Sequence, residues 1–193
     1  IVQPAADSAY GNLYVTIARA TEPTRDPIHR LGDVWHIGPE NQPVRKEISV
    51  SLPKPDGDLR HAAIYRHAGS GWTALATAIH GDHMDAKSSR LGDFAVLEDR
   101  IAPVISKVEA PEKGTATSRR PELRAQVRDV GSGMDSCEIY CGDHWLIAAF
   151  DPEEATMSWE RDEDLPSGPQ TITFNAKDTA GNETKITREI VVP

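Results

Sequence analysis

The segment Leu165-Pro-Ser-Gly-Pro-Gln-Thr-Ile-Thr-Phe-Asn-Ala-Lys-Asp-Thr-Ala-Gly-Asn182 decides the fold of the second half of the chain. Apolar and polar residues alternate in its middle, which is the period-two pattern of a half-buried β-strand; the apolar ones are Ile172, Phe174 and Ala176. The residues that follow, 178–182, predict a tight turn, because Asp, Gly and Asn tolerate turn conformations or cap their own turns. A last strand is expected over 184–192. Such a hairpin indicates an antiparallel β-sandwich.

Five further segments of the second half have the length and alternation of short strands. They cover residues 104–108, 122–129, 136–141, 145–150 and 156–160. Asp129-Val-Gly-Ser-Gly133 supplies a turn between the second and the third of them. Together with the final hairpin they make seven short strands separated by turns, a pattern typical of an immunoglobulin-like β-sandwich.

The first half repeats this organisation of short apolar segments between turn residues. Strands are expected over 13–17, 34–39, 46–53 and 92–97, and a hairpin around 69–71 is expected to join 61–66 to 72–79. The boundary between the two halves is expected between Asp99 and Pro103. This segment is short and charged, and Pro103 at its end holds the preceding residue in an extended conformation, as is typical of a linker. The sequence therefore predicts an all-β protein with two tandem β-sandwich domains, residues 1–100 and 101–193, the second of them immunoglobulin-like.

The composition of the 193 residues argues against several classes of partner. A formal net charge of −9 disfavours nucleic acid, whose phosphates need a basic face, and it equally disfavours an anionic membrane surface. No apolar run approaches the roughly 20 residues needed to span a bilayer, so no membrane insertion is expected. The chain begins at Ile1 without an initiating Met, and we expect a processed form or a piece excised from a longer protein.

The two cysteines, Cys137 and Cys141, are expected on one strand. Four residues along a strand separate their Cα atoms by about 13 Å at ~3.3 Å per residue, and a disulfide needs less than about 7 Å. They are therefore predicted to stay unpaired with each other and to point into the second sandwich with Ile139. Metal ligation is the other interpretation, and burial is preferred because no further Cys or His lies at zinc spacing.

Three spaced motifs in the second half resemble the bacterial immunoglobulin-like modules of secreted and cell-surface proteins. They are Asp129-Val-Gly-Ser-Gly-Met134, Leu165-Pro-Ser-Gly168 and Ala176-Lys-Asp-Thr-Ala-Gly-Asn182. In that family these segments form the turn after the second strand and the last hairpin. The resemblance covers residues 101–193, and its one departure is Pro169, where a His or similar residue is usual.

The first half is similar to the ZU-type sandwich of ankyrins and related proteins. The similarity rests on strand order and on five segments: His36-Ile-Gly-Pro-Glu40, Pro43–Leu52, Ala63-Ile-Tyr-Arg66, Gly71-Trp-Thr-Ala-Leu75 and Leu91-Gly-Asp-Phe-Ala-Val96. Similar modules lie beside catalytic domains in large exported bacterial proteins, including lysostaphin-like peptidoglycan endopeptidases. Some animal relatives cleave themselves between Phe and Ser, and this chain has no Phe-Ser pair.

The segment His80-Gly-Asp-His83, with Asp85 close behind, could bind a metal through its His and Asp side chains. The Gly-Asp pair is also what the tip of a hairpin requires, and a flexible tip supports catalytic geometry poorly. The turn interpretation is preferred. The chain contains no Gly-x-Ser-x-Gly and no His-Glu-x-x-His motif, so no catalytic residue is assigned.

Three aspartates are predicted to converge at the end of the second sandwich. In an immunoglobulin-like fold the turn holding Asp129 and the turn holding Asp178 lie at the end where the chain enters, and Asp99 lies in the entering segment. Like charges held close need an offsetting partner, and Ca²⁺ accepts flexible carboxylate ligands. The alternative is that Asp129 and Asp178 cap the backbone N–H groups of their own turns.

These observations favour a non-catalytic accessory region that spaces or docks the rest of a larger exported bacterial protein, such as a cell-envelope hydrolase or protease. Its expected partners are the remainder of that polypeptide or a component of the cell envelope, in an extracellular, cell-surface or periplasmic location. The alternative is an adhesin or carbohydrate-binding module. Exposed aromatic side chains would carry that function, although core packing is the ordinary role of the four tryptophans, Trp35, Trp72, Trp145 and Trp159.

Overall fold

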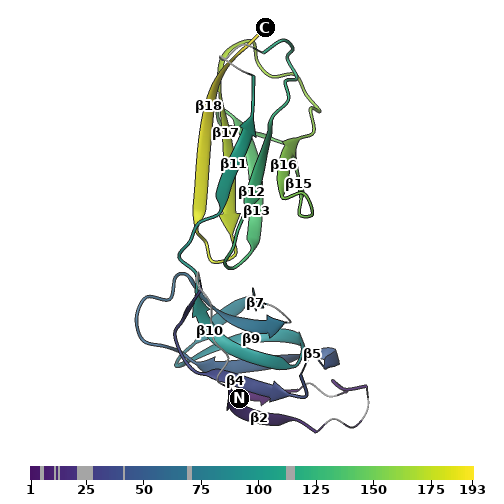
Figure 1. The fold of residues 1–193 in the computed structure, drawn as a ribbon, viewed down its shortest axis with the longest axis vertical. Coiled ribbons are helices and arrows are strands. Elements are labelled where there is room, and N and C mark those ends of the chain that lie inside the picture. The colour runs from purple at the N-terminus through teal and green to yellow at the C-terminus, as the bar shows by residue number, and fades with distance from the viewer. Residues whose placement is uncertain are drawn as a thin grey trace. The chain divides into compact units, whose positions relative to one another are not determined.

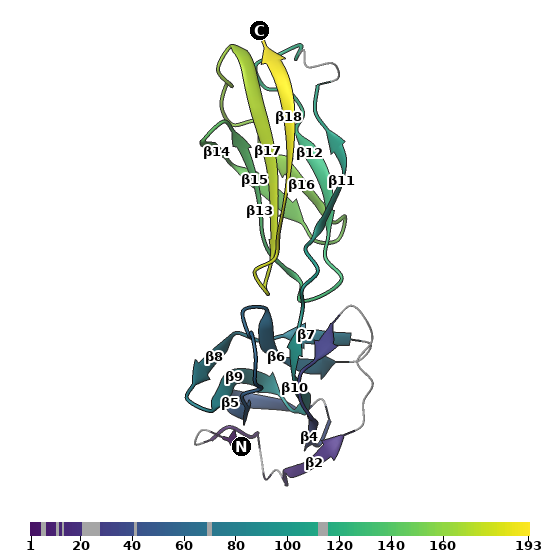
Figure 2. The ribbon, with the colours of Figure 1, turned by 90° about the vertical axis from the view of Figure 1, so that its left-hand side faces the viewer.

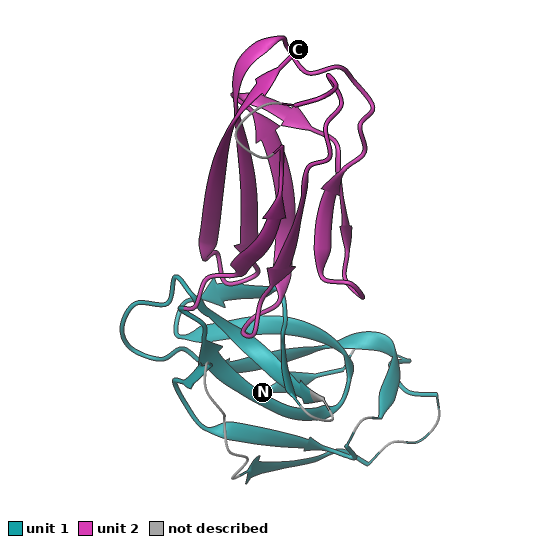
Figure 3. Cartoon of the chain, turned by 45° about the horizontal axis from the view of Figure 1, so that its top comes forward, with its two compact units in different colours: residues 1–100 teal, residues 101–193 magenta. Residues whose placement is uncertain are grey.

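A computed structural model describes residues 1–4, 7–10, 12, 14–20, 28–40, 42–68, 71–111 and 116–193. These residues form strands, turns and irregular segments and contain no helix, hence none that could cross a membrane. They divide into two compact units, Ile1–Arg100 and Ile101–Pro193 (Figure 3). Each unit contains two antiparallel sheets, which confirms the predicted all-β fold with two sandwiches.

The first unit contains one four-stranded and one six-stranded sheet (Figure 1). The four-stranded sheet has the order β1 (Val2–Gln3), β5 (Pro43–Pro53), β9 (His83–Arg90) and β8 (Thr77–His80). The other has the order β2 (Thr16–Ala20), β4 (Val34–Gly38), β10 (Gly92–Glu98), β6 (Ala62–Ala68) and β7 (Gly71–Ala74), and β3 (His29–Arg30) also pairs with β10.

The core of this unit follows from the alternation along β5. Its residues Ile48, Val50 and Leu52 are buried, as predicted, and pack in one cluster with Ile64 and Phe94. A second, smaller cluster lies on the opposite face of the six-stranded sheet and contains Ile28, Val34, Tyr65, Ala95 and Leu97. Because apolar clusters cover both of its faces, every residue of β10 is buried.

The predicted strand 72–79 is wrong, because the chain changes sheets at Leu75. Before this point β7 pairs with β6, and after it β8 pairs with β9 in the other sheet. Thr77 fixes the crossing: its hydroxyl accepts from the backbone N–H of Ile64 at 2.9 Å and donates to the Leu75 carbonyl at 2.8 Å. The predicted turn at residues 69–70 lies outside the described residues, and so does Leu13, where a strand was expected to begin; β2 begins at Thr16.

The described residues of the second unit form eight strands (Figure 2). One sheet has the order β11 (Val104–Glu109), β12 (Arg124–Arg128), β16 (Thr156–Trp159) and β15 (Ala148–Asp151). The other has the order β14 (His144–Leu146), β13 (Met134–Cys141), β17 (Gly168–Asp178) and β18 (Glu183–Val192). Lettered in chain order, the two sheets are A-B-E-D and C′-C-F-G, which is the arrangement of an immunoglobulin-like sandwich.

The long hairpin of β17 and β18 supplies one wall of the second core. Ile172, Phe174 and Ala176 of β17 are fully buried and pack on Ile139 of the neighbouring strand β13. Pro169 lies beyond the part of β17 that pairs with β13, so its missing N–H removes no hydrogen bond from that ladder. The departure from the family pattern at Pro169 therefore leaves the strand intact.

The predicted strand 145–150 is also divided between the two sheets. Leu146 ends β14, which pairs with β13, and Ala148 begins β15, which pairs with β16. The single residue between them, Ile147, is exposed. The single strand predicted over residues 145–150 is therefore two strands, so eight strands are described in the second unit where seven were expected.

Candidate functional site

Asp129 follows β12 and caps the turn that it begins. Its Oδ2 accepts hydrogen bonds from the backbone N–H of Gly131 at 3.0 Å and of Gly133 at 2.7 Å. Two amides of one turn therefore converge on one carboxylate oxygen, which fixes the path of the chain into β13. This is the capping alternative that the sequence left open beside calcium.

Asp178 ends β17 and caps the hairpin turn in the same way. It is buried, its Oδ1 accepts from the backbone N–H of Asn182 at 2.8 Å, and its Oδ2 accepts from the Asn182 side-chain amide at 2.8 Å. Burying a carboxylate costs free energy unless such hydrogen bonds compensate its lost hydration. The turn and the charge therefore stabilise each other.

Hydrogen bonds tie these two turns together within the second unit. The backbone N–H of Thr179 donates to the Gly133 carbonyl at 2.9 Å, and the Thr179 hydroxyl donates to the Ser132 carbonyl at 2.8 Å. As a result, one carboxylate oxygen of Asp129 and one of Asp178 lie within 4.8 Å of each other. Hard cations such as Ca²⁺ bind to paired carboxylates of this kind.

The third predicted ligand, Asp99, belongs to the first unit. It directly follows β10, its side chain is buried, and its backbone N–H donates to the His61 carbonyl at 3.0 Å. Its convergence with Asp129 and Asp178 stays a prediction, and so does calcium binding.

The histidines at the tip of the β8–β9 hairpin contact two different carboxylates. His80 Nδ1 lies 2.8 Å from Asp85 Oδ2, whereas His83 Nδ1 lies 2.5 Å from Asp82 Oδ1. Gly81 occupies the left-handed region at φ 60° in this two-residue turn, a conformation that glycine adopts without strain. The positions of these side chains thus follow from the turn and its flanking pairs, as the turn interpretation predicts.

The tryptophans differ in their environments. Trp159 is buried in the second core, and its indole N–H donates to Asp162 at 3.1 Å. Trp35 and Trp72 are partly buried in the first unit. Trp145 is exposed. Core packing therefore accounts for the first three, and Trp145 needs another explanation.

Both cysteine thiols are free, and both line the second core, as predicted. Burial raises the pKa of the Cys137 thiol to about 11 and also raises the pKa of Cys141. A thiol that stays protonated at neutral pH is a poor nucleophile and a poor metal ligand. This environment suits side chains whose role is packing.

A part-buried pair of His36 and Asp93 was not identified from the sequence. His36 Nδ1 lies 2.5 Å from Asp93 Oδ1 across the neighbouring strands β4 and β10. The next position of β4 on the same face as His36 is Gly38, where an added Cβ would lie 2.9 Å from His36 Nε2 and 2.7 Å from Thr16 Oγ1. Glycine at 38 therefore leaves room for the imidazole. His36 and Asp93 lie 57 positions apart in the sequence, so no local sequence pattern indicated that they would pair.

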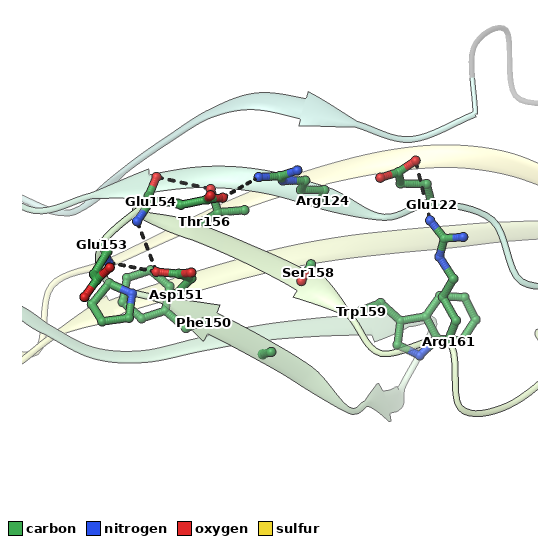
Figure 4. A pocket seen from close by; sticks show the side chains of 12 residues that line it. Glu122, Arg124, Phe150, Asp151, Glu153, Glu154, Thr156, Ser158, Trp159 and Arg161 are labelled. Atoms are coloured by element: carbon green, nitrogen blue, oxygen red, sulfur yellow. Dashed lines mark hydrogen bonds and ion pairs between the residues drawn. The ribbon is translucent and has the colours of Figure 1, made fainter.

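A groove of about 690 Å³ lies on the outer face of the β12–β16–β15 sheet, and its residues were also missed (Figure 4). Two small residues on neighbouring strands, Ser158 and Ala149, lie directly opposite each other and form the floor of the groove. Arg124 pairs with Glu154 at 3.0 Å on one side of Ser158, and Arg161 pairs with Glu122 at 3.5 Å on the other. The volume is typical of small-molecule sites.

The electrostatics of this groove restrict what could bind there. Four acidic side chains line it, Glu122, Asp151, Glu153 and Glu154, against two arginines, so it disfavours polyanions. Asp151 is further engaged by the backbone N–H groups of Glu153 and Glu154 at 2.8 and 3.1 Å. Since both arginines are paired within the groove, its geometry defines no particular ligand.

The chain matches no protein-family model and no curated protein. The fold therefore defines its class: an all-β protein with two β-sandwich units, the second in immunoglobulin-like order.

Proposed function

We propose that this chain is a non-catalytic accessory region of a larger exported bacterial protein, such as a cell-envelope hydrolase or protease, and that it spaces or docks the catalytic part. One observation carries the proposal: each unit is a sandwich with a hydrophobic core of its own. Such units serve as building blocks whose cores do not depend on a ligand or a catalytic centre.

The sheet topology supports the part of this proposal that concerns the kind of module in each unit. The A-B-E-D and C′-C-F-G sheets agree with the resemblance of residues 101–193 to bacterial immunoglobulin-like modules. For residues 1–100 we propose a ZU-type sandwich, supported by the alternating burial along β5 and the complete burial of β10. Fold alone does not define function, so the accessory role needs a direct test.

The proposed partners are the remainder of the polypeptide and components of the cell envelope, in an extracellular, cell-surface or periplasmic location. The formal charge of −9 favours solubility over adsorption to anionic surfaces.

The first experiment asks whether the purified chain turns over dye-labelled peptidoglycan or casein. No release above buffer is expected, and release that co-purifies with the chain would refute the non-catalytic role. The second experiment deletes residues 1–193 from the parent protein. We expect unchanged activity on a small soluble substrate and reduced activity on intact cell envelopes, because only the latter need docking. Equal losses on both substrates would contradict the proposal.

A further inference from the structure

An aromatic pair lies on the outer face of the sheet β14–β13–β17–β18. Trp145 of β14 lies directly opposite Tyr140 of β13, and Tyr140 lies opposite Thr173 of β17. Thr187 of β18 continues the same row. We call Trp145, Tyr140, Thr173 and Thr187 the aromatic row. Strands are about 4.8 Å apart, so the row from Trp145 to Thr173 is about 10 Å long.

Packing does not account for the position of Trp145 in this row. The opposite face of β13 and β14 enters the core through Ile139 and Leu146, whereas Trp145 is 50% exposed. A cross-strand aromatic pair stabilises a sheet, but it does so best when the rings shield each other from water. Half of the Trp145 surface is therefore accessible to a ligand, in a row whose other members are a Tyr and two Thr.

Next to the aromatic row lies a polar network centred on Asn175. This side chain is only 6% exposed although it faces outward from β17, and its Nδ2 donates to Glu138 Oε2 at 3.2 Å. Its Oδ1 accepts no hydrogen bond from any described residue. Glu138 also contacts Tyr140, whose pKa is raised by burial and by its hydrogen bond to Glu138. A buried amide oxygen without a hydrogen-bond donor is energetically unfavourable, so this network is incomplete.

Several charged side chains of this face form ion pairs or hydrogen bonds with neighbouring side chains. Lys185 Nζ lies 3.2 Å from Glu183 Oε1, and the Thr171 hydroxyl donates to Glu189 Oε1 at 2.8 Å. Asn175 and Tyr140 engage Glu138. Among these carboxylates only Glu183 has a cationic partner in the described part of the chain, and Glu138 and Glu189 are held by neutral donors. The face therefore disfavours anions, and a neutral ligand whose hydroxyl groups donate to carboxylates fits it best.

We propose that the aromatic row, together with Glu138 and Asn175, binds a neutral oligosaccharide. The apolar C–H face of one pyranose ring stacks on Trp145, and a second ring extends along the row toward Thr173. A ring hydroxyl donates to the Glu138 carboxylate, which the Asn175 amide N–H and the Tyr140 hydroxyl hold in place beside the aromatic row. The site lies wholly in the second unit and does not depend on the accessory role.

The test uses the complete chain and two soluble probes, cellotetraose and tetra-N-acetylchitotetraose, titrated by calorimetry and by indole fluorescence. We expect at least one of them to bind. Trp145→Ala should weaken that binding by about tenfold or more, while Ile147→Ala, which removes an equally exposed apolar side chain nearby, should leave it unchanged.

Far-UV circular dichroism and the midpoint of thermal unfolding report whether each variant is folded. A second variant, Thr173→Val, keeps the size of the side chain and removes one hydroxyl of the row. It should weaken binding less than Trp145→Ala without changing the fold. Absence of binding of both sugars to the unaltered chain overturns the proposal. Equal affinity of the unaltered chain and a folded Trp145→Ala variant overturns it as well.

Discussion

At the scale of single residues, two carboxylates have the clearest structural role. Asp129 and Asp178 each accept two hydrogen bonds from their own turns, so replacing either one with Ala leaves amide groups without an acceptor. We expect each replacement to lower the free energy of unfolding of the second unit by about 1–3 kcal/mol. Urea titration measures this, with Asp135→Ala, at an exposed position of β13, as the control. An effect no larger than that of the control would contradict the capping role.

Calcium binding by the same carboxylates is a separate prediction. If Asp99 joins Asp129 and Asp178 around an ion, about 1 mM Ca²⁺ should raise the melting midpoint by several degrees over a chelator, because a ligand of the folded state stabilises it. Asp99→Asn should abolish that increase. A midpoint that is the same with calcium and with chelator would eliminate the metal and leave the two turn caps.

The raised pKa of Cys137, about 11, makes the stability of the second unit depend on pH. The unfolded chain releases this proton near pH 8.5, as an ordinary thiol does, while the folded chain still holds it. Above that pH the unfolded state therefore binds fewer protons, and stability falls as the pH rises toward 11. The stability difference between the native chain and Cys137→Ser should shrink across this window in urea titrations. A difference that is constant with pH would contradict the buried environment.

At the scale of elements, the crossing from β14 to β15 depends on adjacent residues with opposite environments. Leu146 is completely buried in the core, whereas Ile147 is 46% exposed at the crossing itself. Leu146→Ala should destabilise the second unit by about 2–5 kcal/mol, because it removes buried methyl groups and leaves a cavity. Ile147→Ala should change stability by less than about 1 kcal/mol. Similar costs from the two variants in a denaturant titration would show that the strand continues without a crossing.

Strand prediction from sequence succeeded where one face of a strand is buried. Alternation identified β5 and β17, because a strand between a core and solvent must place apolar side chains at every second position. It failed at Trp72–Ile79 and at Trp145–Phe150, where the chain leaves one sheet for the other within a single apolar run. Both sheets of a sandwich face the same core, so a change of sheet need not interrupt the apolar pattern.

At the scale of the whole molecule, the second unit should fold without the first. Its core cluster is formed by residues between Ile105 and Val192, and among the described strands none pairs with a strand of the first unit. A fragment of residues 101–193 is expected to unfold cooperatively in urea and to give dispersed amide signals in NMR spectra. A shorter fragment that ends before β18 should not fold, since it lacks Ile190 and Val192 of the core. A disordered 101–193 fragment would contradict the autonomy of the unit.

The candidate sites were predictable to unequal degrees. The roles of Asp129 and Asp178 as turn caps could be read from their positions in Asp/Gly-rich segments, because each of these bonds is made within five residues. The pairing of Trp145 with Tyr140 could not, since it depends on the register of β14 against β13. The groove around Ser158 depends on the registers of three strands in the same way.

The sequence by itself determined the fold class, the turns and the inward faces of most strands, because each of these follows from interactions among residues close together in the chain. Only the tertiary structure decided which sheet each half of an apolar run joins, which outward side chains become neighbours and which polar groups are buried. These outcomes depend on residues far apart in sequence, such as Asn175 and Glu138 or His36 and Asp93. Their contacts form only when the strands pair. The hydrophobic pattern fixes which face of each strand is buried, but it does not indicate which distant strand becomes the neighbour.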